Sequence, residues 1–182
     1  MSMDRDIFWR MIADSRSALD PRDPDENQNR QVSSLQAALE RLPPADIIAF
    51  GDELHALMLE AFRWDLWGVA YIAGDGCSND VFADFRGWLV SMGRDAYESV
   101  LREPDSLARF VADRSVGDLF FERFQYVPAE AYEAVVGGEM PTAVKPDPFR
   151  KPAGTKWQAS ELPALFPKTW AAARALNSTR RH

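Results

Sequence analysis

The sequence is poor in the residues that most often bind metals or act as nucleophiles. It contains one cysteine, Cys77, and two histidines, His55 and His182, among 182 residues. A single cysteine excludes an intramolecular disulfide framework and is typical of a reducing compartment. Zinc sites are usually built from cysteine and histidine, and no CxxC pair is present. We therefore expect neither a metal site nor a cofactor.

Long apolar runs and glycine-rich signatures are also missing. The longest apolar run, Leu66 to Ala73, is interrupted by Gly68 and is far shorter than the ~20 residues that a membrane helix needs. No charged segment followed by an apolar stretch opens the chain, so we expect no signal peptide, no membrane association and a cytoplasmic location. The patterns GxxxxGK[ST], GxGxxG and GxSxG are absent, and we identify no catalytic residue.

Positive charge is scarce overall and unevenly placed. The net charge is −7, which argues against nucleic-acid binding because phosphate contacts need clustered lysine and arginine. Residues 144–182 contain eight basic and two acidic side chains, a net charge of +6, which leaves −13 on the rest of the chain. A basic tail on an acidic body favours docking of the tail on the body; the alternative is that the tail recruits an acidic partner.

What the sequence does have is repeated helical periodicity and many aromatic residues. Hydrophobic residues make up 46% of the chain, enough for a core. Apolar side chains recur at helical spacing, most clearly from Ile47 to Phe62, and no useful strand alternation is present. We predict an all-α, compact bundle of about seven or more helices. The expected helices span residues 4–19, 28–42, 44–63, 66–73, 79–92, 94–102, 105–112, 118–124, 128–136 and 168–176.

The composition changes after Gly137 and Gly138. Prolines and a glycine at positions 141, 146, 148, 152 and 154 predict an extended segment, and apolar anchors return between Trp157 and Trp170. We therefore divide the chain into a helical domain, residues 1–137, and a basic, proline-rich C-terminal arm, residues 138–182. The arm ends in a short helix, and its anchors predict that it packs on the domain, because they would otherwise expose a large apolar patch.

The richest group of polar and aromatic residues lies between Arg63 and Arg94. Aromatic faces interleaved with arginine and aspartate can hold a polar, planar ligand, but they can equally lock helices together through ion pairs. Asp84 and Arg86 lie about 160° apart on one helix, at about 100° per residue, so they cannot pair with each other. The candidate ligand-binding residues are Arg63, Trp64, Asp65, Trp67, Asp80, Asp84, Arg86, Trp88 and Arg94.

Three single residues have simpler structural interpretations. Asp65 follows a break near Arg63 and Trp64, and we predict that it caps the helix beginning at Leu66. His55 lies at the edge of an apolar stripe and is favoured as a hydrogen-bonded helix residue over a catalytic base. Cys77 has no histidine nearby in sequence and is favoured as a buried, unreactive thiol.

Several segments of the sequence together resemble a known bacterial family. They are Phe8–Ile12, Arg63–Tyr71, Gly76–Asp80, Phe85–Arg94 and Tyr126–Tyr132. With these segments, residues from about Met3 to Gly137 are similar to the domain-of-unknown-function 4240 family. Where that family usually reads Gly-Gly-Cys-Ser-Asp-Asp, this chain has Asp75 and Asn79 in place of a glycine and an aspartate. The resemblance implies a helical bacterial domain of the cytoplasm and implies no activity.

The sequence thus favours a non-enzymatic binding or regulatory interaction module, because it contains no nucleophile–base or metal-ligating set. Its partner would be another protein or a small polar ligand. The alternative is a small polar-ligand-binding protein or enzyme that uses the cluster between Arg63 and Arg94. Exposure of the charged residues of this cluster would favour the alternative.

Overall fold

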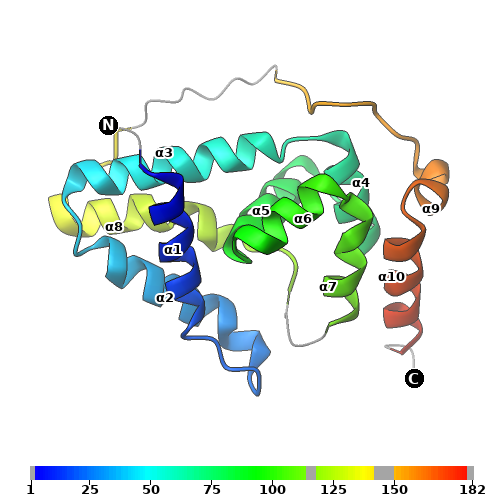
Figure 1. Cartoon of the computed structure of the whole chain (residues 1–182), viewed down its shortest axis with the longest axis horizontal. Coiled ribbons are helices and arrows are strands. Elements are labelled where there is room, and N and C mark those ends of the chain that lie inside the picture. The colour runs from blue at the N-terminus through cyan, green and yellow to red at the C-terminus, as the bar shows by residue number, and fades with distance from the viewer. Residues whose placement is uncertain (1–2, 114–117, 142–149, 180–182) are drawn as a thin grey trace.

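The computed structural model describes residues 3–113, 118–141 and 150–179. Helices joined by short turns make up most of residues 3–113 and 118–136, whereas residues 150–158 are extended and lead into the last helices (Figure 1). The elements are α1 (Arg5–Arg16), η1 (Pro24–Glu26), α2 (Asn27–Leu39), α3 (Pro44–Glu60), α4 (Trp64–Ala73), α5 (Asn79–Ser91), α6 (Arg94–Arg102), η2 (Pro104–Leu107), α7 (Ala108–Ala112), η4 (Glu122–Tyr126), α8 (Val127–Val136), η5 (Ala159–Glu161), α9 (Leu162–Leu165) and α10 (Pro167–Thr179).

The predicted all-α fold is confirmed for the described residues. They contain helices α1 to α10 and no strand, apart from one isolated bridge between Arg63 and Ala153. The apolar stripe of α3 accounts for its central position, since Ile47, Phe50 and Leu57 are fully buried. No described helix combines the length and apolar character needed to cross a bilayer.

Helices α1, α2, α3 and α8 pack together in one half of the molecule (Figure 1). Phe8 of α1 meets Phe50 of α3 with ring centroids 4.5 Å apart, and Trp9 packs edge-on against Phe8 at 5.2 Å. The short 3₁₀ turn η4 leads into α8 and packs on α5, so it connects this half to the other. Large aromatic side chains therefore fill the joints between helices.

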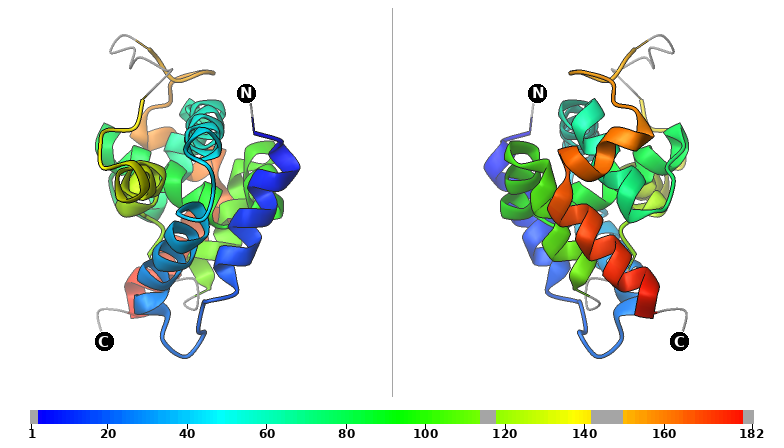
Figure 2. Two further views of the ribbon diagram at one scale, coloured as in Figure 1. Left: turned by 90° about the vertical axis from the view of Figure 1, so that its left-hand side faces the viewer. Right: turned by 90° about the vertical axis from the view of Figure 1, so that its right-hand side faces the viewer.

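The other half contains α4, α5, α6, η2 and α7. The hydroxyl of Tyr97 in α6 donates to the Leu57 carbonyl of α3 over 2.8 Å and connects the halves. Helix α10 packs on α7 and α4, and α9 packs on α4, so both cover the outer face of this half (Figure 2). The expected last helix at residues 168–176 lies within α10, whereas α9 was not predicted.

Local residue signals mark several helix ends. Ser78 caps α5 by accepting the Val81 N–H over 3.2 Å. Gly93 separates α5 from α6 with a φ of 93°, a conformation that favours glycine. Helix α6 spans the predicted residues Arg94–Arg102.

Some of the arm's predicted features lie outside the described residues. These are the basic and proline residues at positions 145, 146 and 148 and the basic residues 180 and 181. The described part of the arm, residues 150–179, contains η5, α9 and α10.

Candidate functional site

The beginning of α4 brings together the first of the candidate residues. Arg63 pairs with Asp65 through two hydrogen bonds, one of them from Nε to Oδ1 at 3.0 Å, and its Nη1 donates to the Leu101 carbonyl at 2.9 Å. Asp65 also accepts the N–H of Leu66 over 2.8 Å. Both charged groups are therefore engaged in holding α4 to the end of α6.

The prediction that Asp65 caps this helix was wrong by two residues. Helix α4 begins at Trp64, and its N-cap is Arg63, which has an extended backbone. The Trp64 N–H, which a helix start leaves unpaired, donates to the Ala153 carbonyl over 2.9 Å. Because this acceptor comes from the distant arm, local sequence did not reveal it.

Trp64 and Trp67 form the start of an aromatic stack. Their rings lie nearly parallel with centroids 5.1 Å apart, and the other face of Trp67 stacks on Phe82 of α5 at 4.9 Å. The Trp67 indole N–H donates to the Cys77 carbonyl over 2.9 Å. The two stacked rings and the Trp67 indole N–H thus join α4, α5 and the turn between them.

Arg86 is a half-buried cation whose described partners are uncharged. Its guanidinium lies 4.8 Å from the Phe62 ring centroid and 5.1 Å from that of Phe82. It donates to the carbonyls of Met58 at 2.8 Å and Phe82 at 3.3 Å. Burial lowers the pKa of Arg86 to about 10. The residue links α5 to the end of α3 and makes no salt bridge among the described residues.

The two aspartates of α5 differ in their surroundings. Asp80 is exposed, whereas Asp84 is partly buried and accepts a hydrogen bond from Gln125 over 3.2 Å. Burial, and then the negative charges of Glu122 and Asp80, raise the pKa of Asp84. As the helical spacing required, Asp84 and Arg86 do not pair with each other.

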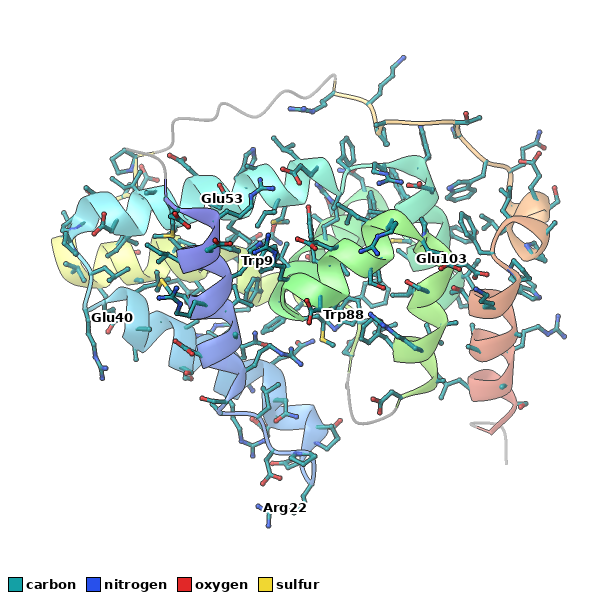
Figure 3. The ribbon with its side chains drawn as sticks, viewed as in Figure 1. Trp9, Arg22, Glu40, Glu53, Trp88 and Glu103 are labelled. Carbon is teal, nitrogen blue, oxygen red and sulfur yellow. The ribbon has the colours of Figure 1, made fainter. Side chains whose placement is uncertain are left out.

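The two remaining candidates lie apart from the cluster. Trp88, labelled near the centre of Figure 3, is almost fully buried and packs edge-on against Phe110 at 5.6 Å. Arg94 is exposed and pairs with Asp6 and Glu98, each at 2.7 Å. The structure therefore joins the α4 and α5 residues but places Arg94 on a different surface.

The cysteine and the described histidine have environments that suppress charge. Burial raises the pKa of the Cys77 thiol to about 12, which keeps the sulfur protonated and weakly nucleophilic near neutral pH. Burial and the nearby Arg86 lower the pKa of His55. Across residues 3–113, 118–141 and 150–179, no group of three or more acidic, histidine or cysteine side chains could hold a metal ion.

Residues of the arm complete this region and were not included in the candidate set. The Trp157 indole N–H donates to the Trp64 carbonyl over 2.6 Å, and Lys156 lies 5.2 Å from the Trp64 ring centroid. The arm residue Phe166 lies close to Gly68 of α4, in the middle of the family-like segment. A glycine within an apolar helix is a sequence signal for such close approach, although the approaching segment cannot be read from it.

Comparison with known proteins identifies a family but no activity. No curated protein and no solved structure is detectably similar to the chain. A family described as "Protein of unknown function (DUF4240)" matches residues 3–134, which include α1 to α7 and most of α8 but none of residues 150–179. The match covers well over half of the sequence and the segments that carry the resemblance. The chain therefore belongs to the DUF4240 family.

Proposed function

We propose that the DUF4240 domain of this chain is a non-enzymatic interaction module that binds an extended peptide with aromatic anchors. Its binding surface consists of Trp64, Gly68 and Tyr71 of α4 and Asp105 of η2, and we name it the arm-contact surface. In this chain the described arm, residues 150–179, occupies that surface. The observation that carries the proposal is that a segment outside the family match makes both main-chain and aromatic contacts with the family domain.

The main-chain contact resembles the addition of a short strand. The Ala153 N–H donates to the Phe62 carbonyl, and the Ala153 carbonyl accepts the Trp64 N–H, each over 2.9 Å. Main-chain bonding of this kind gives affinity without depending on the side chain at that position, a common mode of peptide recognition. Ala153 is itself exposed, which is consistent with such a role.

Aromatic and apolar side chains add selectivity next to this bridge. Trp157 packs edge-on against Trp64, with centroids 6.1 Å apart, and lies 5.2 Å from the Tyr71 ring. Leu162 and Phe166 are buried against the domain. A Cβ atom on Gly68 would lie 2.6 Å from the Phe166 ring, so the absence of a side chain there is what admits this anchor.

A third set of contacts holds the start of α10. The Asp105 carboxylate accepts the N–H groups of Lys168 at 3.0 Å and Thr169 at 2.8 Å. The Lys168 ammonium pairs with Glu103 at 2.7 Å, and Glu103 is labelled beside α10 in Figure 3. Exposed ion pairs contribute little energy, so this acidic edge serves mainly to orient a basic segment.

The charged residues between Arg63 and Arg94 support this interpretation over a ligand pocket or an active site at the same place. Arg63 and Asp65 pair with each other, and Arg86 donates to two carbonyls and covers two rings. None of these groups forms a nucleophile–base pair. A small ligand would therefore have to displace existing contacts that join α3, α4 and α5.

The test uses the full chain carrying Trp157→Ala and Phe166→Ala together, which removes two aromatic anchors of the arm and leaves the residues of the domain unchanged. A fluorescent peptide of residues 150–170 is titrated into this variant and into the wild-type chain. We expect saturable binding to the double variant and binding at least about tenfold weaker to the wild type, because its own arm competes at high effective concentration.

The matched control adds Gly68→Ala to the double variant. Alanine favours a helix over glycine by about 1 kcal/mol, so this change does not weaken α4 itself, but its methyl group occupies the space of Phe166. Peptide binding should then be lost. The proposal is wrong if the folded double variant binds no peptide, or if a peptide carrying both alanine substitutions binds equally well.

A further inference from the structure

A cleft of about 290 Å³ lies between α1, α2, α5 and α7, and Trp88 is one of the residues that line it. Its volume is near the lower end of the ~300–1,000 Å³ typical of small-molecule sites. Arg16 and Gln31 supply its inner polar groups, and Trp88, Phe110 and Phe121 supply aromatic walls. None of these residues takes part in the arm-contact surface.

Arg16 is the unusual member of this cleft. Only its Nη1 group makes hydrogen bonds among the described residues, to the Ser91 carbonyl at 3.2 Å and the Met92 sulfur at 3.4 Å. No salt bridge joins it to a carboxylate in the described chain, and burial lowers the pKa of its guanidinium. Among other partly buried arginines, Arg30 and Arg63 have carboxylate partners, whereas Arg86 has none in the described part of the chain and is satisfied by two carbonyls and two aromatic rings.

The unused donors of Arg16 have a defined geometry. Nε and Nη2 are neighbouring N–H groups that bind a carboxylate side-on with two parallel hydrogen bonds. Gln31, beside Arg16, is held in place by donating to the Ser91 carbonyl at 2.8 Å and the Ser15 hydroxyl at 3.3 Å. The same carbonyl thus positions both side chains.

We propose that this cleft, which we name the Arg16 cleft, binds a small planar monocarboxylate, with its carboxylate on Nε and Nη2 of Arg16 and its apolar body against Trp88, Phe110 and Phe121. Aromatic walls favour a flat apolar ligand, and pairing with an anion would compensate the desolvated guanidinium. The inference is independent of the peptide-binding proposal.

The surrounding charge selects a monoanion over a dianion. Asp113 and Asp118 are exposed and also line the cleft, and the whole chain has a net charge of −7. A doubly charged phosphate would meet about twice the repulsion of a carboxylate from these groups. Inorganic phosphate therefore serves as the probe that separates a carboxylate site from a general anion site.

The experiment titrates benzoate, benzamide and inorganic phosphate into the full wild-type chain by calorimetry and saturation-transfer NMR. Benzamide has nearly the same shape as benzoate without its charge. We expect benzoate to bind with a Kd on the order of 1 mM, as for other ligands of this size, and benzamide and phosphate to bind at least about tenfold more weakly. Equal binding of benzamide, stronger binding of phosphate, or no binding of benzoate would overturn the proposal.

The matched variants are Arg16→Met and Arg10→Met, which remove one positive charge each from α1. Arg10 is exposed, so it controls for the change in net charge. Arg16→Met should weaken benzoate binding at least about tenfold, whereas Arg10→Met should change it less than about twofold. Should Arg16→Met not fold, Arg16→Lys retains the charge without the planar donor pair and should also weaken binding. Unchanged binding in a folded Arg16 variant contradicts the assignment.

Discussion

Two regions of this molecule place an arginine beside a tryptophan, and they differ in what satisfies the arginine. At the start of α4, Arg63 lies next to Trp64, pairs with Asp65 and forms a main-chain bridge with Ala153 of the arm. In the Arg16 cleft, Arg16 lies beside Trp88 and uses one of its three nitrogens for described hydrogen bonds. The residue types are the same, but all three nitrogens of Arg63 donate hydrogen bonds within the described part of the protein, whereas Nε and Nη2 of Arg16 do not.

The residue types present at a site therefore do not show whether it is a structural cluster or a binding site; the hydrogen-bond partners of those residues must also be known. A guanidinium carries five N–H donors, and the number left unused by the protein indicates what remains for a ligand. By that measure, most of the charged groups between Arg63 and Arg94 already have partners within the protein and hold helices together. The cleft at Arg16 is the better place for a small molecule.

The largest expected change in the free energy of unfolding comes from removing the Phe166 ring, which packs the arm on α4. Phe166→Ala removes a ring that is 8% exposed and packed on Gly68, and should lower the free energy of unfolding by about 3–5 kcal/mol. Chemical denaturation monitored by circular dichroism measures this loss.

The neighbouring Leu165 provides the control for Phe166, since it is 53% exposed. Leu165→Ala should change the free energy of unfolding by no more than about 0.5 kcal/mol. Similar small effects of both substitutions would show that the arm contributes little to stability. That result would favour the alternative in which the arm recruits an acidic partner.

Changing Arg63 and Arg16 to methionine in separate variants should lower the free energy of unfolding by different amounts. Arg63→Met removes the arginine donor from the partly buried Asp65 carboxylate, which keeps the Leu66 N–H, and from the Leu101 carbonyl, and should cost about 1–3 kcal/mol. Arg16→Met separates no ion pair and should cost less than about 1 kcal/mol or stabilise the fold, because a desolvated charge is removed. Denaturant titrations of both variants test this order, and equal costs contradict it.

The smallest expected effect is a gain in stability at Asp84. Burial and negative neighbours raise the pKa of this carboxyl above its ordinary value of 3.8, so the folded state binds a proton more readily than the unfolded state. The charged form therefore destabilises the fold at neutral pH. Asp84→Asn should raise the free energy of unfolding at pH 7 by less than about 1 kcal/mol, because the site is partly open to solvent.

The pH dependence provides the control for Asp84. The gain should be present at pH 7 and should diminish as pH falls through the raised pKa, disappearing below the unfolded value, where the carboxyl is neutral in both states. Thermal unfolding of wild type and variant across this range measures it. A gain that persists at low pH would show that another property of the substitution is responsible.

Periodicity and turn residues predicted most of the helical architecture, but the helix expected at residues 118–124 was wrong, because residues 118–121 are not helical and only the 3₁₀ turn η4 follows them. Helix α6, the Ser78 cap and the break at Gly93 each depend on residues within one or two turns. The start of α4 was misplaced because its Trp64 N–H is paired with Ala153, far along the chain. Contacts that are local in sequence were predictable, and those that cross between segments were not.

The same distinction applies to the candidate site. The spacing of Asp84 and Arg86 correctly excluded a pair on one helix, yet gave no sign that Arg86 would reach the Met58 carbonyl of α3. Arg16 was not a candidate, because a lone arginine near a helix end has no distinguishing local pattern. Its significance depends on the groups that α2, α5 and α7 place around it.

The contact between Asp105 and the beginning of α10 has a consequence for the order in which the chain folds. The first N–H groups of a helix need acceptors, and two of those in α10 find theirs on η2, more than sixty residues earlier in the sequence. Starting a helix is the unfavourable step of its formation, and an external acceptor reduces that cost only once it is in place. Positioning of η2 should therefore precede growth of α10, so that the last helix in the sequence is also among the last to become stable.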